Sequence, residues 1–115
     1  MRPLAVVTVI ILSGMPLAAV AQSKGIRLWN LTTATMTGFQ LSPAGQNNWG
    51  PNQTLGDKDK ELDHDERLKL TGIEPGRYDA KVSYAGDRQC FVRGLDIKAD
   101  AVVSVADKDL KECTK

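Results

Sequence analysis

Apolar and polar residues alternate over the second half of the chain. Positions 78, 80, 82 and 84 are apolar or aromatic and are interleaved with charged or hydroxyl-bearing residues, and residues 67–71 repeat the pattern around Leu68 and Leu70. A period of two with one apolar face is typical of a half-buried antiparallel strand. Turn-forming residues bound the stretch 77–84, with Glu74-Pro75-Gly76 before it and Ala85-Gly86-Asp87 after it.

Four further segments have strand-like composition. Residues 90–97 form one, with a bulge predicted at Gly94 where the alternation slips, and residues 101–105 form another. Upstream, residues 26–31 and 36–41 are rich in β-branched, aromatic and aliphatic side chains. No convincing helical stripe exceeds two turns after the N-terminal segment, so we expect an all-β fold, a small antiparallel β-sandwich of about six strands with one long loop.

The N-terminal segment has the pattern of an export signal. A single charge at Arg2 precedes a short apolar run, Leu4–Leu12, and Ala19-Val20-Ala21 follows with small residues at the cleavage positions. The apolar run is shorter than the ~20 residues that span a bilayer. We therefore expect a signal peptide at 1–21, a single domain at 22–115, and a periplasmic or secreted location without membrane insertion after cleavage.

Charge and size narrow the function classes. The chain of 115 residues carries 15 basic and 14 acidic side chains, which gives no general electrostatic case for nucleic-acid binding. Without residues 1–21, the mature domain has 94 of the 115 residues and buries only about 60–65% of its unfolded surface, so an additional covalent constraint would stabilise it.

Two cysteines, Cys90 and Cys113, can supply that constraint. An even count in an exported chain favours a disulfide. Free thiols and a chemical role are the alternatives, although neither residue belongs to a CxxC pair. We expect a structural bridge that contributes about 3 kcal/mol.

The stretch 42–56 is rich in Gly, Pro, Asn and Gln and predicts a long loop with Trp49 as its only aromatic residue. Trp49 either folds back onto one end of the sandwich or forms a binding surface, and both interpretations remain open. Asn30-Leu31-Thr32 and Asn52-Gln53-Thr54 match the glycosylation sequon, which is a short and frequently occurring motif.

Six carboxylates and two lysines fall within residues 57–66. Carboxylates at this density favour either a solvated loop or a hard cation. If Leu55 is position 1 of an EF-hand-type calcium loop, oxygen ligands fall at positions 3, 5, 9 and 12, which are Asp57, Asp59, Asp63 and Glu66. Leu55 cannot ligate through its side chain, and Lys60 stands where the loop prefers Gly. His64 offers a third alternative, a transition-metal ligand.

Catalytic signatures are missing from the sequence. There is no phosphate-binding Gly-rich loop, no GxSxG and no HExxH, and His64 is the only imidazole. A hydrolase or lyase that used paired acidic residues would need two carboxylates in different environments across a pocket. We therefore do not expect an enzyme.

Several segments carry a resemblance: IRLWNLTTATMTGFQLSPAG, NWGPNQ, the acidic DKDKELDHDERLKL and GIEPGRYDAKV. Together they are similar to a group of small exported bacterial proteins that share a WGPN loop, an acidic DKD loop and a PG-x-YD hairpin. The resemblance covers nearly all of the mature chain and implies export, but none of its motifs specifies a reaction. In the similar proteins the acidic loop reads DKDG, whereas Lys60 replaces that Gly here.

These observations favour a non-enzymatic β-sandwich that acts as a binding or interaction module in the periplasm. Its expected contact surface is the Trp49 loop with the adjacent acidic loop, and its expected partner is another periplasmic protein. The alternative is a weak Ca²⁺-binding module that uses residues 55–66.

Overall fold

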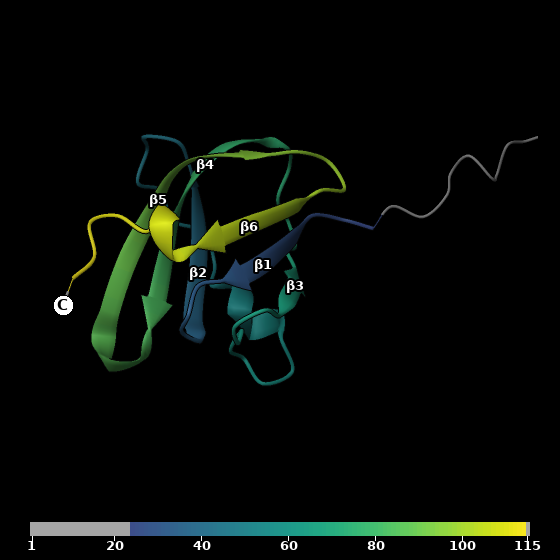
Figure 1. Cartoon of the computed structure of the whole chain (residues 1–115). Coiled ribbons are helices and arrows are strands. Elements are labelled where there is room, and N and C mark those ends of the chain that lie inside the picture. The colour runs from purple at the N-terminus through teal and green to yellow at the C-terminus, as the bar shows by residue number, and fades with distance from the viewer. Residues whose placement is uncertain (1–23, 115) are drawn as a thin grey trace, which may run out of the picture.

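Six strands form the framework of the described part of the protein. The computed structural model describes residues 24–114, so the predicted signal peptide lies outside the described residues (Figure 1). The strands are β1 (Arg27–Leu31), β2 (Met36–Pro43), β3 (Arg67–Lys69), β4 (Gly76–Tyr84), β5 (Arg88–Ile97) and β6 (Val102–Ala106). Within residues 24–114 there are also three short 3-10 turns, η2 (Gln53–Gly56), η3 (Ala85–Asp87) and η4 (Asp107–Asp109). The expectation of an all-β fold is confirmed.

The first sheet has the strand order β3-β1-β6. β1 pairs with β3 in antiparallel orientation and with β6 in parallel orientation. The parallel pair joins strands from opposite ends of the domain, so the expectation of a purely antiparallel architecture is wrong for this sheet. Alternation dictated by the pleat buries Leu28, Leu68 and Val103 on one face and leaves the intervening residues outside.

The second sheet has the order β2-β4-β5 and is antiparallel throughout. η3 closes the β4–β5 hairpin, and Gly86 adopts a φ of 76° there, as such a tight turn requires. The segment Glu74-Pro75-Gly76 does not close a hairpin, because β3 pairs with β1 and not with β4. The chain between β3 and β4 therefore connects the two sheets, and the PG-x-YD motif runs into the first residues of β4.

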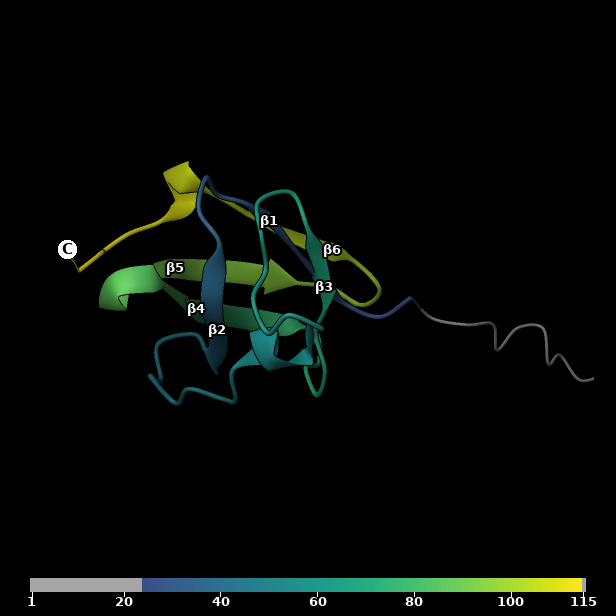
Figure 2. The same cartoon turned by 90° about the horizontal axis from the view of Figure 1, so that it is seen from below.

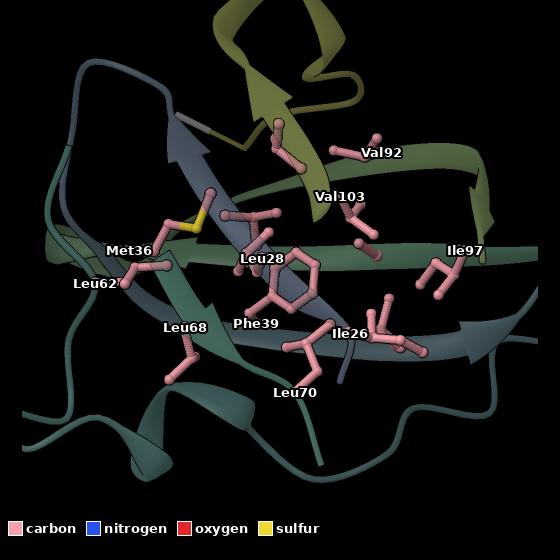
Figure 3. Packing of buried hydrophobic residues seen from close by; sticks show 14 of the residues in the cluster. Ile26, Leu28, Met36, Phe39, Leu62, Leu68, Leu70, Val92, Ile97 and Val103 are labelled. Carbon is pink, nitrogen blue, oxygen red and sulfur yellow. The ribbon is translucent and has the colours of Figure 1, made fainter. Parts of the chain in front are cut away.

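The inner faces of both sheets enclose one apolar core (Figures 2 and 3). Phe39 of β2 is fully buried near its centre beside Leu28 of β1, and Met36 of β2 is fully buried in the same core. The other buried apolar residues are Ile26, Leu41, Leu62, Leu68, Leu70, Ala80, Val82, Tyr84, Cys90, Val92, Ile97, Val103 and Val105. Burial raises the pKa of the Tyr84 hydroxyl, which donates a hydrogen bond to Thr32 Oγ1 at 3.1 Å.

The bulge predicted at Gly94 is confirmed. Tyr78 of β4 faces Leu95 of β5, but Ala80 faces Val92, so two residues of β5 lie opposite Asp79. Gly94 has a φ of 69°, a conformation that residues with a Cβ adopt at a cost. The bulge places Arg93 and Gly94 opposite Asp79, and these three residues belong to the site described below.

Candidate functional site

Trp49 rests on the outer face of the β2-β4-β5 sheet. Its ring centroid is 5.7 Å from that of Phe91, with the planes tilted by 43°. The long loop is held there because Gly50 donates its N–H to the Leu41 carbonyl at 2.9 Å and Gln40 Nε2 donates to the Gly50 carbonyl at 2.9 Å. Trp49 thus covers the outer surface of a sheet and does not close one end of the core.

Two cations flank the aromatic pair. Lys81 lies opposite Phe91 in the β4–β5 ladder, and its Nζ is 5.1 Å from the Trp49 ring centroid. The Arg93 guanidinium carbon is 4.6 Å from the centroid of Phe91. Cations at these distances are attracted by the ring faces. We call these four residues (Trp49, Phe91, Lys81 and Arg93) the aromatic platform. Arg93 is exposed and the other three are half-buried, so the platform stays accessible to a partner.

The Asp79 carboxylate supports the aromatic platform through three hydrogen bonds. Its carboxylate accepts hydrogen bonds from the backbone N–H groups of Gly45 at 2.9 Å and Gly94 at 3.0 Å, and from Arg93 Nη1 at 3.3 Å. The residue is only 5% exposed. The Gly45 N–H lowers the pKa of Asp79 most strongly, and the Gly94 N–H and the Arg93 charge act in the same direction against the opposing effect of burial. One carboxylate therefore joins the long loop, the β5 bulge and the platform arginine.

Glu112 holds Arg93 from the other side. Its carboxylate accepts from Arg93 Nη2 at 2.9 Å and from Nε at 3.2 Å, a two-point contact that lowers the pKa of Glu112 and raises that of Arg93. The geometry directs the planar guanidinium across Phe91.

The predicted disulfide between Cys90 and Cys113 is confirmed and fixes the segment that carries Glu112. Phe91 exchanges two backbone hydrogen bonds with Lys111, of 2.8 and 2.7 Å, and Thr114 donates its N–H to the Gln89 carbonyl at 2.8 Å. The C-terminal segment thereby extends the sheet beyond β5 and protects part of its edge.

A polar groove of about 340 Å³ lies beyond this segment. The residues that line it are Val92, Arg93, Gly94, Leu95, Ser104, Lys108, Asp109 and Lys111. Most of its charges are already paired, Arg93 with Glu112 and Lys108 with Asp109 at 3.4 Å. The groove borders the platform at Arg93 but has little unpaired charge of its own with which to select a ligand.

The four predicted calcium ligands do not converge. Asp57 accepts the N–H of Asp59 at 2.9 Å, Asp63 accepts the hydroxyl of Thr35 at 2.8 Å, and Glu66 accepts the N–H of Asp63 at 2.9 Å. Within residues 24–114, no three His, Cys, Asp or Glu side chains are grouped so that they could hold a metal ion. Asp57 and Glu66 instead cap turns of the loop, and Asp63 links the loop to Thr35.

Two further residues of the acidic loop, Lys60 and His64, have structural roles. Lys60, which replaces the expected Gly, adopts a φ of 60°, so the sharp turn forms without glycine. The ring Nδ1 of His64 lies 2.7 Å from the Thr32 carbonyl, which gives this imidazole a structural contact.

The Trp49 loop and the acidic loop are held at opposite ends of β2. The chain after Trp49 runs back along β2: Gly50 pairs with Leu41, whereas Leu62 of the acidic loop pairs with Met36 at the start of the strand. Five strand residues separate these contacts, or about 17 Å. The aromatic platform contains the Trp49 part of the expected contact surface.

Both N-x-T motifs form the same structural clamp. The side-chain oxygen of Asn30 accepts the N–H and the hydroxyl of Thr32, at 2.9 and 2.6 Å, and Asn52 accepts the corresponding groups of Thr54 at 3.0 and 2.9 Å. Asn30 is fully buried. The motifs therefore serve turns in this fold.

No family model, curated protein or solved structure matches the chain. Within the described residues, no helix combines the length and apolar character needed to cross a membrane.

Proposed function

We propose that the protein is an exported, non-enzymatic β-sandwich that binds another protein of the periplasm or the extracellular space through the aromatic platform. The observation that carries this proposal is the arrangement of Trp49 and Phe91 side by side on an outer sheet face, between the cations Lys81 and Arg93.

The residue types of the platform are those that contribute most to protein interfaces. Trp, Tyr and Arg are enriched among residues whose truncation costs binding energy, and Phe is enriched in interface cores. Arg93 is oriented in advance by Asp79 and Glu112, and Trp49 is held by the backbone contacts of its loop. A surface ordered before binding loses less conformational entropy when its partner arrives.

The Cys90–Cys113 bridge and the signal-peptide pattern at 1–21 support an exported location, because disulfides persist in oxidising compartments. The resemblance to small exported bacterial proteins agrees with this location.

The test is a comparative capture from an envelope extract of the source organism, with immobilised residues 22–115 as bait. We expect Trp49→Ala and Phe91→Ala to lose the captured protein. Leu55→Ala is the matched control, because Leu55 is a large apolar residue with 60% exposure that lies in η2, outside the platform. Equal capture by wild type and both platform variants, with all baits folded by thermal melting, would refute the proposal.

A further inference from the structure

The two cations of the aromatic platform differ in how far the domain neutralises them. Arg93 makes salt bridges with Asp79 at 3.3 Å and with Glu112 at 2.9 Å, so two carboxylates already serve this one guanidinium. Lys81, in contrast, forms no salt bridge with any residue that the structure describes. Its ammonium group lies 5.1 Å from the Trp49 ring centroid, and a ring face attracts a cation without cancelling its charge. Lys81 can therefore still accept a carboxylate from outside the domain.

A second lysine lies on the other side of Phe91. Phe91 pairs with Lys81 of β4 on one side and with Lys111 of the C-terminal segment on the other. Directly paired residues of antiparallel strands have their side chains on the same face, so Lys111 shares the outer face with the platform. Its side chain is exposed, and within residues 24–114 it has no salt-bridge partner either.

These three residues form a row across the sheet, which we call the Lys-Phe-Lys row (Lys81, Phe91 and Lys111). Adjacent strands are about 4.8 Å apart, so the two lysine backbones are separated by about 10 Å. The positive charge that the domain leaves without a partner thus lies on both sides of one aromatic ring. The Trp49 ring, 5.7 Å from that of Phe91, widens the apolar centre of the row.

We infer that, provided the aromatic platform is the contact surface proposed above, the partner protein contributes an acidic segment in which two carboxylates flank an apolar side chain. The apolar side chain packs against Phe91 and Trp49, and the carboxylates pair with the lysines at the two ends of the row. In an extended segment, residues i, i+2 and i+4 lie on one face and span about 13 Å. The flexible lysine side chains cover the difference between this span and the ~10 Å of the row.

The charges and the rings contribute different properties to this contact. Removal of the aromatic contact weakens binding as a whole, whereas pairing of exposed charges chiefly sets selectivity and the rate of association. Because salt screens exposed charges, the preference for carboxylates should decrease as ionic strength rises. Lys81 is half-buried and Lys111 is exposed, so Lys81 should contribute the larger share.

Peptide binding to residues 22–115 tests the preference. The probe is a peptide with Glu-Ser-Phe-Ser-Glu at its centre and Gly-Ser flanks, and its matched control carries Gln in place of both Glu residues. NMR titration at about 20 mM salt should show at least ~10-fold tighter binding of the acidic probe, with shifts centred on Phe91, and a smaller difference in about 0.5 M salt. Equal affinities for the two peptides, or no binding of the acidic probe, would overturn the inference.

Substitution of the lysines makes the test specific. Lys81→Gln and Lys111→Gln should each reduce the preference for the acidic probe about 3-fold or more, and the double variant should abolish it. Lys69→Gln is the control, because it removes an exposed strand lysine from the other sheet, and the preference should stay within about two-fold of wild type. Thermal melting checks that all variants fold. A preference that persists in the double variant excludes the Lys-Phe-Lys row as its source.

Two further measurements separate this inference from its rivals. If phosphatidylglycerol vesicles, and not the acidic probe, bind the domain through the same two lysines, the row serves a lipid surface and the inference is wrong. If capture from the envelope extract requires Trp49 and Phe91 but is unchanged in the double lysine variant, the platform remains the contact surface and the acidic segment is excluded. If capture requires neither aromatic residue, the proposed function itself fails.

Discussion

Replacing Asp79 with alanine should destabilise the domain more than the loss of any other carboxylate described in residues 24–114. The side chain is buried and serves three donors from three parts of the chain: Gly45, Gly94 and Arg93. Truncation leaves two backbone N–H groups without their acceptor, and it frees the long loop from the β5 bulge.

The expected loss follows from these contacts. An N–H left unpaired on burial costs about 1–3 kcal/mol, and the contact with the more exposed Arg93 adds at most about 1 kcal/mol. We therefore expect the free energy of unfolding to fall by about 3 kcal/mol. A domain of this size has about 5–14 kcal/mol in total, and the loss corresponds to a decrease in Tm of about 12–24 °C.

The same contacts predict a pH dependence. Because folding lowers the pKa of Asp79, its stabilising contribution is complete above the unfolded-state pKa of about 3.9 and is lost as the pH falls through the lower pKa of the folded state. The difference in unfolding free energy between wild type and Asp79→Ala should thus be constant near neutral pH. It should narrow below about pH 4.

Urea unfolding monitored by tryptophan fluorescence at pH 7, and then stepwise to about pH 2, measures both effects. Asp96→Ala is the control, because Asp96 makes an exposed pair with Arg77 at 3.9 Å and its loss should cost less than about 0.5 kcal/mol. Equal stability of Asp79→Ala and wild type at pH 7, or a difference that does not change with pH, would contradict the assigned role.

Three further predictions concern other parts of the domain. Reduction of Cys90–Cys113 should lower the free energy of unfolding by about 3 kcal/mol and increase hydrogen exchange at Phe91, because only backbone hydrogen bonds and the exposed Arg93–Glu112 ion pair then tether the C-terminal segment to the β5 edge. Unchanged exchange would count against this protection. Gly94→Ala should lower the free energy of unfolding, measured in urea, by about 1–2 kcal/mol, because Gly94 has a positive φ. The control is Gly56→Ala, which should lower it by less than about 0.5 kcal/mol, because Gly56 has an ordinary φ and open space around it. Addition of Ca²⁺ to several millimolar should leave Tm unchanged, because the loop carboxylates cap turns and do not converge; a rise in Tm with saturation would show that the loop rearranges around the ion.

The local features of the fold could be read from the sequence because they depend on neighbouring residues. Alternation located β4 and its apolar face, the slip in periodicity located the bulge at Gly94, and the pair of cysteines predicted the bridge. Each of these signals lies within one strand or follows from a residue count and the compartment.

The pairing partners could not be read in the same way. Nothing near β1 or β6 reveals that they pair in parallel across some 70 residues, because the pairing depends on distant segments. Alternation places Asp79 on the outer face of β4, and only the bulge opposite it and the return of the long loop at Gly45 make it a buried acceptor. A carboxylate within an otherwise regular strand, opposite a predicted bulge, is the signal that could have indicated its role.

The position of Trp49 also depended on long-range structure. The Gly-, Pro-, Asn- and Gln-rich loop that carries Trp49 is compatible both with a core cap and with a binding surface, because the sequence does not show which side chain the indole contacts. The answer required Phe91, which lies 42 positions away and faces outward from β5. The acidic loop is held at the other end of β2, because the intervening residues run back along that strand.

The affinity of the captured partner for the platform variants tests the central claim most directly. In titration calorimetry with the purified partner, Phe91→Ala should weaken binding about 30-fold or more, which corresponds to the ~2 kcal/mol lost when a central aromatic contact is removed, while Leu55→Ala should stay within about two-fold of wild type. Equal affinities for wild type and Phe91→Ala would contradict the assignment of the aromatic platform as the contact surface.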